Sequence, residues 1–187
     1  MKNVLILHGT QASSKSNWFL WLRDELEKKG FKTWLPDLPG SDLPSLQSIS
    51  KFILASKDWE FNSDSIIIGH SSGAIAILAI LNELSSNVVL DKCIFVSYFE
   101  KNSSGGEWEP NAKLFDYDFD FAKIKTKAKK FIIIHSDNDP YAPLTGAKVL
   151  AEKLGGELIV KKDQGHFNLE KGEQYHQFPE LLELIEE

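Results

Sequence analysis

Cysteine is nearly absent from this chain of 187 residues, which contains only Cys93. A single cysteine can form neither an internal disulfide nor a multi-thiolate metal site, so a disulfide-stapled fold and a zinc finger are both excluded. The five histidines are scattered, and no H-E-x-x-H motif of a zinc hydrolase occurs. We therefore expect no metal and no other cofactor.

Long apolar segments and basic runs are also missing. The longest apolar stretch, Ile75–Leu84, has ten residues and includes Asn82 and Glu83, whereas a membrane-spanning helix needs about 20. Because strand-like Val4–Leu7 begins within four residues of the start, we expect no signal peptide. The net charge of −6 disfavours binding to phosphate backbones. We expect a soluble, cytoplasmic protein with no membrane or nucleic-acid partner.

What the sequence does contain is a regular alternation of short apolar runs and helical patterns. Several runs are continuously apolar, as in strands buried on both faces of a parallel sheet. The predicted strands are Val4–Leu7, Thr33–Leu35, Ser65–Ile68, Lys92–Val96, Phe131–Ile134 and Glu157–Val160. The predicted helices are Asn17–Lys29, Leu46–Lys57, Ser72–Leu84, Leu144–Leu154 and Phe178–Glu186. We predict one α/β domain over residues 1–187, a three-layer α/β/α sandwich with a mainly parallel six-stranded sheet.

One segment, Phe99–Lys130, interrupts this alternation. It contains a Ser-Ser-Gly-Gly stretch, then Trp108, and then aromatic residues that alternate with aspartates over residues 115–121. Long connections in compact domains are often functional loops. Packing of the aromatic side chains onto the edge of the sheet is an equally good interpretation, and both remain open.

The clearest motif lies between a predicted strand and a predicted helix, where residues 69–73 read Gly-His-Ser-Ser-Gly. This is the G-x-S-x-G nucleophile elbow in its expected strand–turn–helix setting. Ser71 has glycine two residues before it and two residues after it, whereas Ser72 does not. The glycines are needed because the serine occupies a sharp, strained corner where larger side chains would collide. Ser71 is therefore the candidate nucleophile.

A serine hydroxyl becomes a useful nucleophile only when a base accepts its proton. In hydrolases with this elbow, an acid and then a histidine follow later strands. His166 comes after the last predicted strand and is the candidate base. Asp137 and Asp139 both follow the strand before it. We favour Asp139 because the residue before a proline is held extended, whereas Asp137 is suited to capping the turn.

The other histidines have different expected roles. His8 closes the first strand and is predicted to fix the next loop by a hydrogen bond. His70 lies inside the elbow and is expected to point away from the pocket. His135 lies within a strand and is assigned to the core, while His176 is expected to be solvated.

The developing oxyanion of an acyl-transfer reaction needs hydrogen-bond donors. The Ser72 amide, at the start of a helix, is the first candidate. The second candidate is the Thr10 amide in the loop after the first strand, with Gln11 as the alternative.

The sequence resembles the α/β-hydrolases, and within them the small serine hydrolases grouped with retinoblastoma-binding protein 9 and the YdeN-like proteins. The resemblance runs nearly end to end and rests on these segments: His8-Gly9 with Asn17-Trp18, Pro36–Pro39, Gly69–Gly73, Ser136–Pro143 and Gly165–Phe167. It implies that Asp139 is the acid, because the family's acid directly precedes a proline. Ala142 departs from the family's usual valine without touching a catalytic atom. The resemblance also implies a minimal fold without a large cap, and it leaves the natural substrate undefined.

These observations predict a serine hydrolase that acts on small carboxylic esters, with thioesters and short amides as further acyl substrates. Ser71 would form the acyl-enzyme, with His166 as base and Asp139 as orienting acid. Trp108, Tyr141 and Phe167 are the expected substrate-binding residues, together with the segment 37–43. The alternative is a protein-interaction module on a hydrolase scaffold, with an unidentified protein partner and vestigial or secondary activity.

Overall fold

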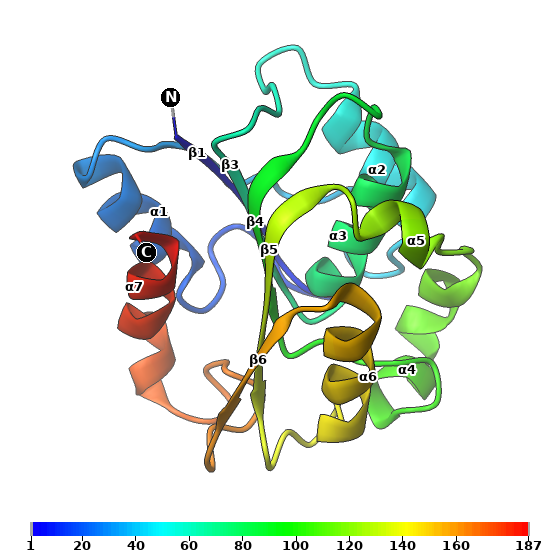
Figure 1. The fold of residues 1–187 in the computed structure, drawn as a ribbon. Helices are drawn as coiled ribbons and strands as arrows, with labels where there is room; N and C mark the ends of the chain where they lie inside the picture. Colours follow the sequence, from blue (N-terminus) through cyan, green and yellow to red (C-terminus); the bar gives the residue numbers. More distant parts are fainter. Residues whose placement is uncertain (1, 187) are drawn as a thin grey trace.

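A six-stranded sheet forms the middle layer of the computed structural model, which describes residues 2–186 (Figure 1). Its strands are β1 (Asn3–Leu7), β2 (Lys32–Trp34), β3 (Ser65–His70), β4 (Leu90–Val96), β5 (Ala128–Ser136) and β6 (Glu157–Lys161). They lie in the order β2-β1-β3-β4-β5-β6, and every neighbouring pair is parallel. The predicted sandwich is confirmed, and its sheet is parallel throughout.

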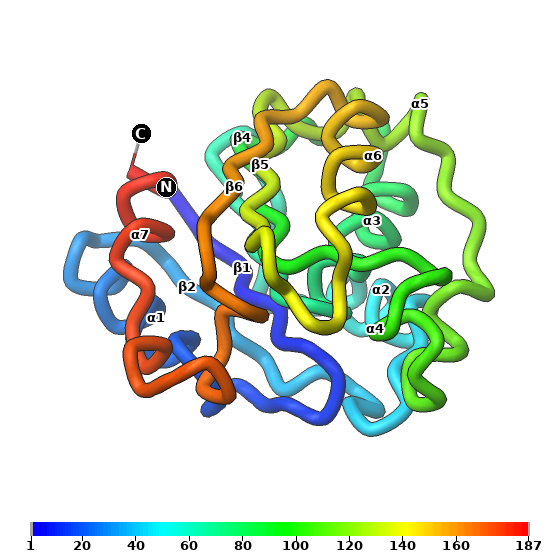
Figure 2. Tube along the Cα trace, turned by 90° about the horizontal axis from the view of Figure 1, so that it is seen from below, coloured from blue at the N-terminus to red at the C-terminus, as the bar shows by residue number. Residues whose placement is uncertain are grey.

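Helices cover both faces of the sheet. They are α1 (Phe19–Lys28), α2 (Leu46–Leu54), α3 (Ser72–Glu83), α4 (Ser104–Glu107), α5 (Phe121–Ile124), α6 (Leu144–Leu154) and α7 (Pro179–Glu186), with the 3-10 helices η1 (Glu109–Phe115) and η2 (Glu173–His176). Figures 1 and 2 both show α1 and α7 on one side of the sheet and α2, α3 and α6 on the other. None of these helices is long and apolar enough to cross a membrane.

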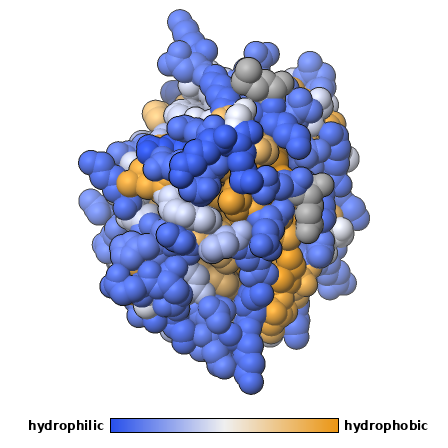
Figure 3. Space-filling model, turned by 90° about the vertical axis from the view of Figure 1, so that its left-hand side faces the viewer, coloured by the Kyte–Doolittle hydropathy of each residue, from blue (hydrophilic) through white to orange (hydrophobic). Residues whose placement is uncertain are grey.

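The continuously apolar strands are explained by this two-sided cover. In β1, Val4 and Ile6 pack in the core beneath α1 and α7, whereas Leu5 and Leu7 pack in the core on the α3 side. Successive side chains of a strand point to opposite faces, so both sets must be apolar when both faces are buried. The outer surface on the α1 and α7 side is mostly hydrophilic around a narrow apolar strip (Figure 3).

The interrupting segment contains more structure than a loop, because α4, η1 and α5 all lie within it. Its later aromatic residues, including Tyr117 and Phe119, are partly buried against the core on the α3 side. Its earlier part, residues 104–111, lies beside the main cavity of the molecule. The packing interpretation therefore fits the later half of the segment, although its aromatic residues pack on the core and not on the sheet edge. For the earlier half, a functional role stays a prediction.

Strand β3 ends nearer the elbow than predicted. It continues through His70, which pairs with Val96 of β4. The order of strands reverses between β1 and β3, with β2 on one side of β1 and β3 on the other. Loops that leave the carboxyl ends of strands at such a switch point commonly form binding sites in open α/β sheets.

Candidate active site

Ser71 occupies the strained corner expected of a nucleophile elbow. Its backbone angles are φ 59° and ψ −123°, between the end of β3 and the start of α3. A Cβ on Gly69 would lie 2.3 Å from the Gly73 carbonyl oxygen, and a Cβ on Gly73 would lie 2.5 Å from the Leu7 oxygen. Because these neighbours are backbone atoms, no side-chain movement would relieve the overlap. The glycine requirement predicted from the motif thus has a direct steric cause.

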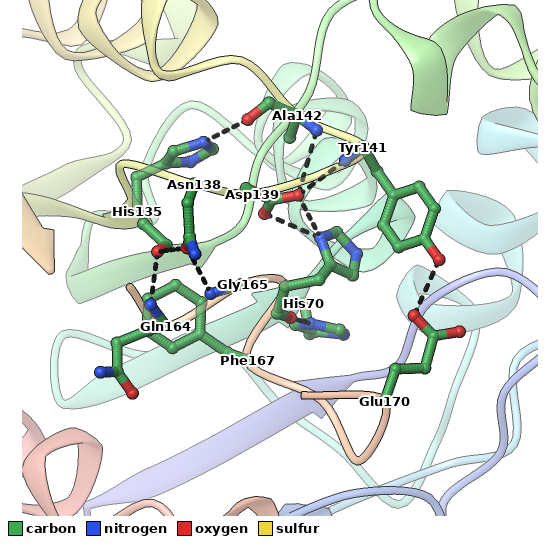
Figure 4. A network of polar contacts seen from close by, with 12 residues as sticks. His70, His135, Asn138, Asp139, Tyr141, Ala142, Gln164, Gly165, Phe167 and Glu170 are labelled. Carbon is green, nitrogen blue, oxygen red and sulfur yellow. Dashed lines mark hydrogen bonds and ion pairs between the residues drawn. The ribbon is translucent and has the colours of Figure 1, made fainter. Parts of the chain in front are cut away.

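Asp139 and His166 are joined although 27 residues separate them in the chain (Figure 4). His166 Nδ1 lies 2.8 Å from Asp139 Oδ2 and 3.0 Å from Oδ1. The Asp139 side chain is fully buried, and its Oδ1 also accepts hydrogen bonds from the amides of Tyr141 and Ala142. Asp139 therefore sits in a socket whose donors hold its carboxylate in one orientation.

The electrostatics of this pair favour an ionised acid. Burial alone would raise the pKa of Asp139, but the His166 hydrogen bond and charge and the Tyr141 amide outweigh it and lower that pKa. A carboxylate can only accept, so His166 Nδ1 must carry the hydrogen, and the neutral ring keeps Nε2 as an acceptor. The pair thus presents a histidine tautomer suited to removing a proton.

Ser71 and His166 line the same cavity, which has a volume of about 920 Å³. The Ser71 hydroxyl makes no hydrogen bond to another of the residues 2–186, so it is free to turn toward a base or a substrate. Hydrogen bonds between catalytic groups often tighten only when substrate is bound.

Asp137, the alternative acid, has another place in the structure. It is exposed, and its Oδ1 accepts a hydrogen bond of 2.8 Å from the Asp163 amide. The neighbouring Asn138 accepts from the Ser136 hydroxyl and from the Gly165 amide, and the second bond joins the loops that carry Asp139 and His166. Figure 4 shows the contact between Asn138 and Gly165. These contacts place Asp139, and not Asp137, beside His166. The role of Asn138 was not anticipated, although asparagine in a turn was a usable signal.

His70 supports the site from beneath instead of pointing away from it. Its ring is buried, and Nε2 lies 2.7 Å from the main-chain oxygen of His166, to which it must donate. The two imidazole rings lie 4.8 Å apart. Burial lowers the pKa of His70 to about 3, so the ring is neutral at ordinary pH. His70 therefore holds the backbone of the candidate base without competing for its proton.

The remaining histidines occupy the predicted settings. His8 accepts from the Leu38 amide at Nε2 and donates from Nδ1 to the Gly9 oxygen, both at 2.8 Å, which fixes the loop after β1. His135 is buried in the core and donates to the Ala142 oxygen. His176 is exposed, as expected.

Hydrogen bonds in the loop after β1 distinguish Thr10 from Gln11 as the candidate for the second oxyanion donor. The Gln11 amide already donates to the Ser41 oxygen at 2.8 Å, whereas the Thr10 and Ser72 amides donate no hydrogen bond to any of the residues 2–186. The Thr10 hydroxyl contacts Ser72 Oγ at 2.9 Å and donates to Asn111 Oδ1 at 2.5 Å. The Thr10 amide, in a loop that lines the cavity with Ser71, and the Ser72 amide, next to Ser71 in the chain, are thus both unused, and the Thr10 hydroxyl ties its loop to η1.

The cavity is lined by two of the three predicted substrate-binding residues. Trp108 and Tyr141 line it and are 44% and 38% exposed. Phe167 does not line it, so this prediction was wrong: its side chain is 1% exposed and stacks on Phe178 at 5.3 Å. Phe167 has a φ of 50°, and its carbonyl accepts from Trp18 Nε1 while its ring lies in the core beneath α1 and α7. The sequence predicted the position of its neighbour His166 beside the cavity, but it did not predict that the Phe167 side chain points into the core.

The segment 37–43 also differs from its expected role. None of its residues lines the cavity. Instead Leu38 and Ser41 brace the loop that carries Thr10, through the bonds to His8 and Gln11 described above. Within residues 2–186, no group of His, Cys, Asp and Glu side chains is arranged to hold a metal ion.

Comparisons with known proteins identify the family and the fold. The model of the serine hydrolase family matches residues 4–187. YdeN of Bacillus subtilis (strain 168) is 30% identical over 175 residues, covering 91% of this chain and 88% of its own. The serine hydrolase RBBP9 of Rattus norvegicus is 29% identical over 171 residues, covering 90% and 84%. The crystal structure of the B. subtilis ydeN gene product superposes with a TM-score of 0.90 at 27% identity, covering 100% of this chain and 97% of that one. With its α/β-hydrolase fold and a family match that spans nearly every residue, this chain belongs to the serine hydrolase family.

Proposed function

We propose that this hydrolase cleaves small carboxylic esters through an acyl-enzyme formed on Ser71. The observation that carries the proposal is the buried Asp139–His166 hydrogen bond of 2.8 Å beside a cavity that also contains the strained Ser71. A carboxylate, a histidine and an elbow serine are the three groups that activate a hydroxyl for attack on a carbonyl.

In the first half of the reaction, Ser71 Oγ attacks the carbonyl carbon of the ester while His166 Nε2 takes its proton. Asp139 stays ionised, holds the ring by Nδ1 and stabilises the imidazolium that forms. The carbonyl oxygen becomes negatively charged and is placed to accept from the Thr10 and Ser72 amides. Removing one such donor typically costs about 3–4 kcal/mol of transition-state stabilisation.

Collapse of the tetrahedral intermediate then breaks the bond to the leaving alcohol. His166 gives the proton to the departing oxygen, which leaves an acyl group on Ser71. In the second half, water attacks the acyl carbon, His166 accepts its proton, and the return of that proton to Ser71 Oγ releases a carboxylic acid. Every proton is therefore carried by one histidine.

Labelling with a fluorophosphonate probe tests whether Ser71 is the reactive serine. Folded wild-type protein should be labelled and should hydrolyse a p-nitrophenyl ester, and Ser71→Ala should lose both properties. Ser86→Ala, in an exposed loop outside the cavity, is the matched control and should behave as wild type. Absence of labelling in folded wild-type protein would contradict the proposal and favour a non-catalytic interaction module.

The identity of the acid is tested by replacing the two aspartates separately with asparagine. Asp139→Asn should lower kcat by about 10⁴-fold, because an amide cannot hold the required histidine tautomer. Asp137→Asn should keep kcat within a few-fold of wild type, since its side chain only accepts from the Asp163 amide. Equal losses in the two variants would leave the assignment of Asp139 unsupported.

A further inference from the structure

The charges that line the cavity are all of one sign. Glu107 of α4 and Glu170 of the loop after His166 both line it, whereas no lysine or arginine does. Neither glutamate forms an ion pair with another of the residues 2–186. The overall charge of −6 has the same sign as these two carboxylates.

Glu170 is held at a defined position beside the candidate base. Its Oε2 accepts a hydrogen bond of 2.8 Å from the Tyr141 hydroxyl, and the Tyr141 ring packs edge-on against His166 with centroids 5.0 Å apart (Figure 4). That hydrogen bond, more than burial, raises the pKa of Tyr141, so the phenol stays neutral. Glu170 therefore accepts from a neutral phenol, and it forms no ion pair with another of the residues 2–186.

Two aromatic rings accompany the carboxylates. Trp108, which directly follows Glu107, and Tyr141 line the same cavity with substantial exposure. Aromatic faces attract ammonium groups through their quadrupole. A carboxylate gives no such attraction and is repelled by the glutamates. The glutamates and the aromatic rings of the lining thus both favour a positively charged substrate.

We propose that the cavity selects esters bearing a protonated amine over isosteric esters bearing a carboxylate. This inference rests on the proposed function, since it concerns the substrate of the Ser71 reaction. The kcat/KM for neutral esters lies between the values for the two charged classes. Acyl donors that carry phosphate groups are disfavoured for the same reason as carboxylates.

Three p-nitrophenyl esters with six-carbon acyl chains provide the test: 6-aminohexanoate, hexanoate and the monoester of adipate. At low ionic strength we expect kcat/KM to fall in that order, with the ammonium ester at least tenfold above the carboxylate ester. Because exposed charges are screened by salt, the ratio should shrink several-fold in 0.5 M NaCl. Flexible chains of this length let the charged end reach the aromatic and acidic lining.

Neutral replacements identify the groups responsible. Glu107→Gln and Glu170→Gln should each lower the ammonium-to-carboxylate ratio by threefold or more, and the double variant should bring it close to one. A glutamine at 170 can still accept from the Tyr141 hydroxyl, so the local structure is retained. Glu60→Gln, beyond the amino ends of the strands and outside the cavity, is the matched control and should keep the wild-type ratio.

The results separate this inference from the function on which it rests. Ser71-dependent hydrolysis of the hexanoate ester with a charge ratio of one, or a ratio unaffected by the glutamate replacements, would overturn the charge selection alone. Absence of Ser71-dependent hydrolysis of all three esters would overturn the proposed function itself.

Discussion

The buried His70 makes the stability of this protein sensitive to acid. Its pKa is about 3 in the folded protein, against an ordinary value of 6.5, because burial opposes the charged ring. Below pH 6.5 the unfolded chain takes up a proton at His70 that the folded protein does not. The contribution of His70 to stability is therefore complete above pH 6.5 and is lost progressively as the pH falls toward 3.

The size of this effect follows from the two pKa values. Lowering the pH from 7.5 to 4.5 crosses the ordinary pKa of histidine and two pH units below it, at about 1.4 kcal/mol per unit, so His70 alone should remove roughly 2–3 kcal/mol from the free energy of unfolding. Burial also lowers the pKa values of His8 and His135, which therefore add losses of the same sign. A comparison with a variant that lacks only His70 cancels those additional losses.

Urea unfolding at pH 7.5 and pH 4.5 measures the difference. In His70→Gln, whose amide can still donate to the His166 oxygen, the loss of stability between the two pH values should be smaller than in wild type by roughly 2–3 kcal/mol. His176→Gln, at an exposed position, is the control and should show the wild-type loss. Equal losses in wild type and His70→Gln would refute the reasoning, because they would mean that His70 is not held neutral by burial.

Two further predictions concern packing. Gly73→Ala should destabilise the protein by about 3 kcal/mol or more, since its Cβ would meet the Leu7 carbonyl oxygen at 2.5 Å, whereas Gly30→Ala, with nothing within 4 Å and a φ of 84°, should cost only about 1–2 kcal/mol; similar midpoints in urea would contradict this. Phe167→Ala should cost about 3–5 kcal/mol because the ring is fully buried, while Trp108→Ala should change stability by less than about 0.5 kcal/mol and act on ester kinetics instead. Thermal and urea unfolding of both variants, measured beside kcat/KM, would expose a reversed pattern.

Features encoded in short stretches of sequence were predictable. Strands buried on both faces are continuously apolar, and in the helices between them apolar residues recur every three to four positions. The parallel sandwich therefore follows from local patterns. The elbow at Ser71 was predictable for a similar reason, because its strain demands glycine on both sides within five residues. His166 could be found because loops after parallel strands meet at one edge of the sheet.

Features that depend on contacts between distant loops were not predictable to the same degree. Asp137 and Asp139 are two residues apart, and the sequence favoured Asp139 only through the following proline and the family pattern; the socket of amides and the buried contact with His166 place Asp139 beside that histidine. Gln11 became a poor oxyanion donor because its amide is used by Ser41, 30 residues away. Phe167 follows His166 directly, yet its ring is directed into the core.

The sequence by itself therefore determined the architecture and pointed to the elbow serine and the candidate histidine, because backbone strain and two-sided burial act on neighbouring residues. The tertiary structure alone decided which carboxylate reaches that histidine, that His70 supports it from below, and that Glu107 and Glu170 face the same cavity. These outcomes depend on the directions in which separate loops leave the sheet. No local pattern specifies those directions, since they are set by hydrogen bonds and packing between segments far apart in the chain.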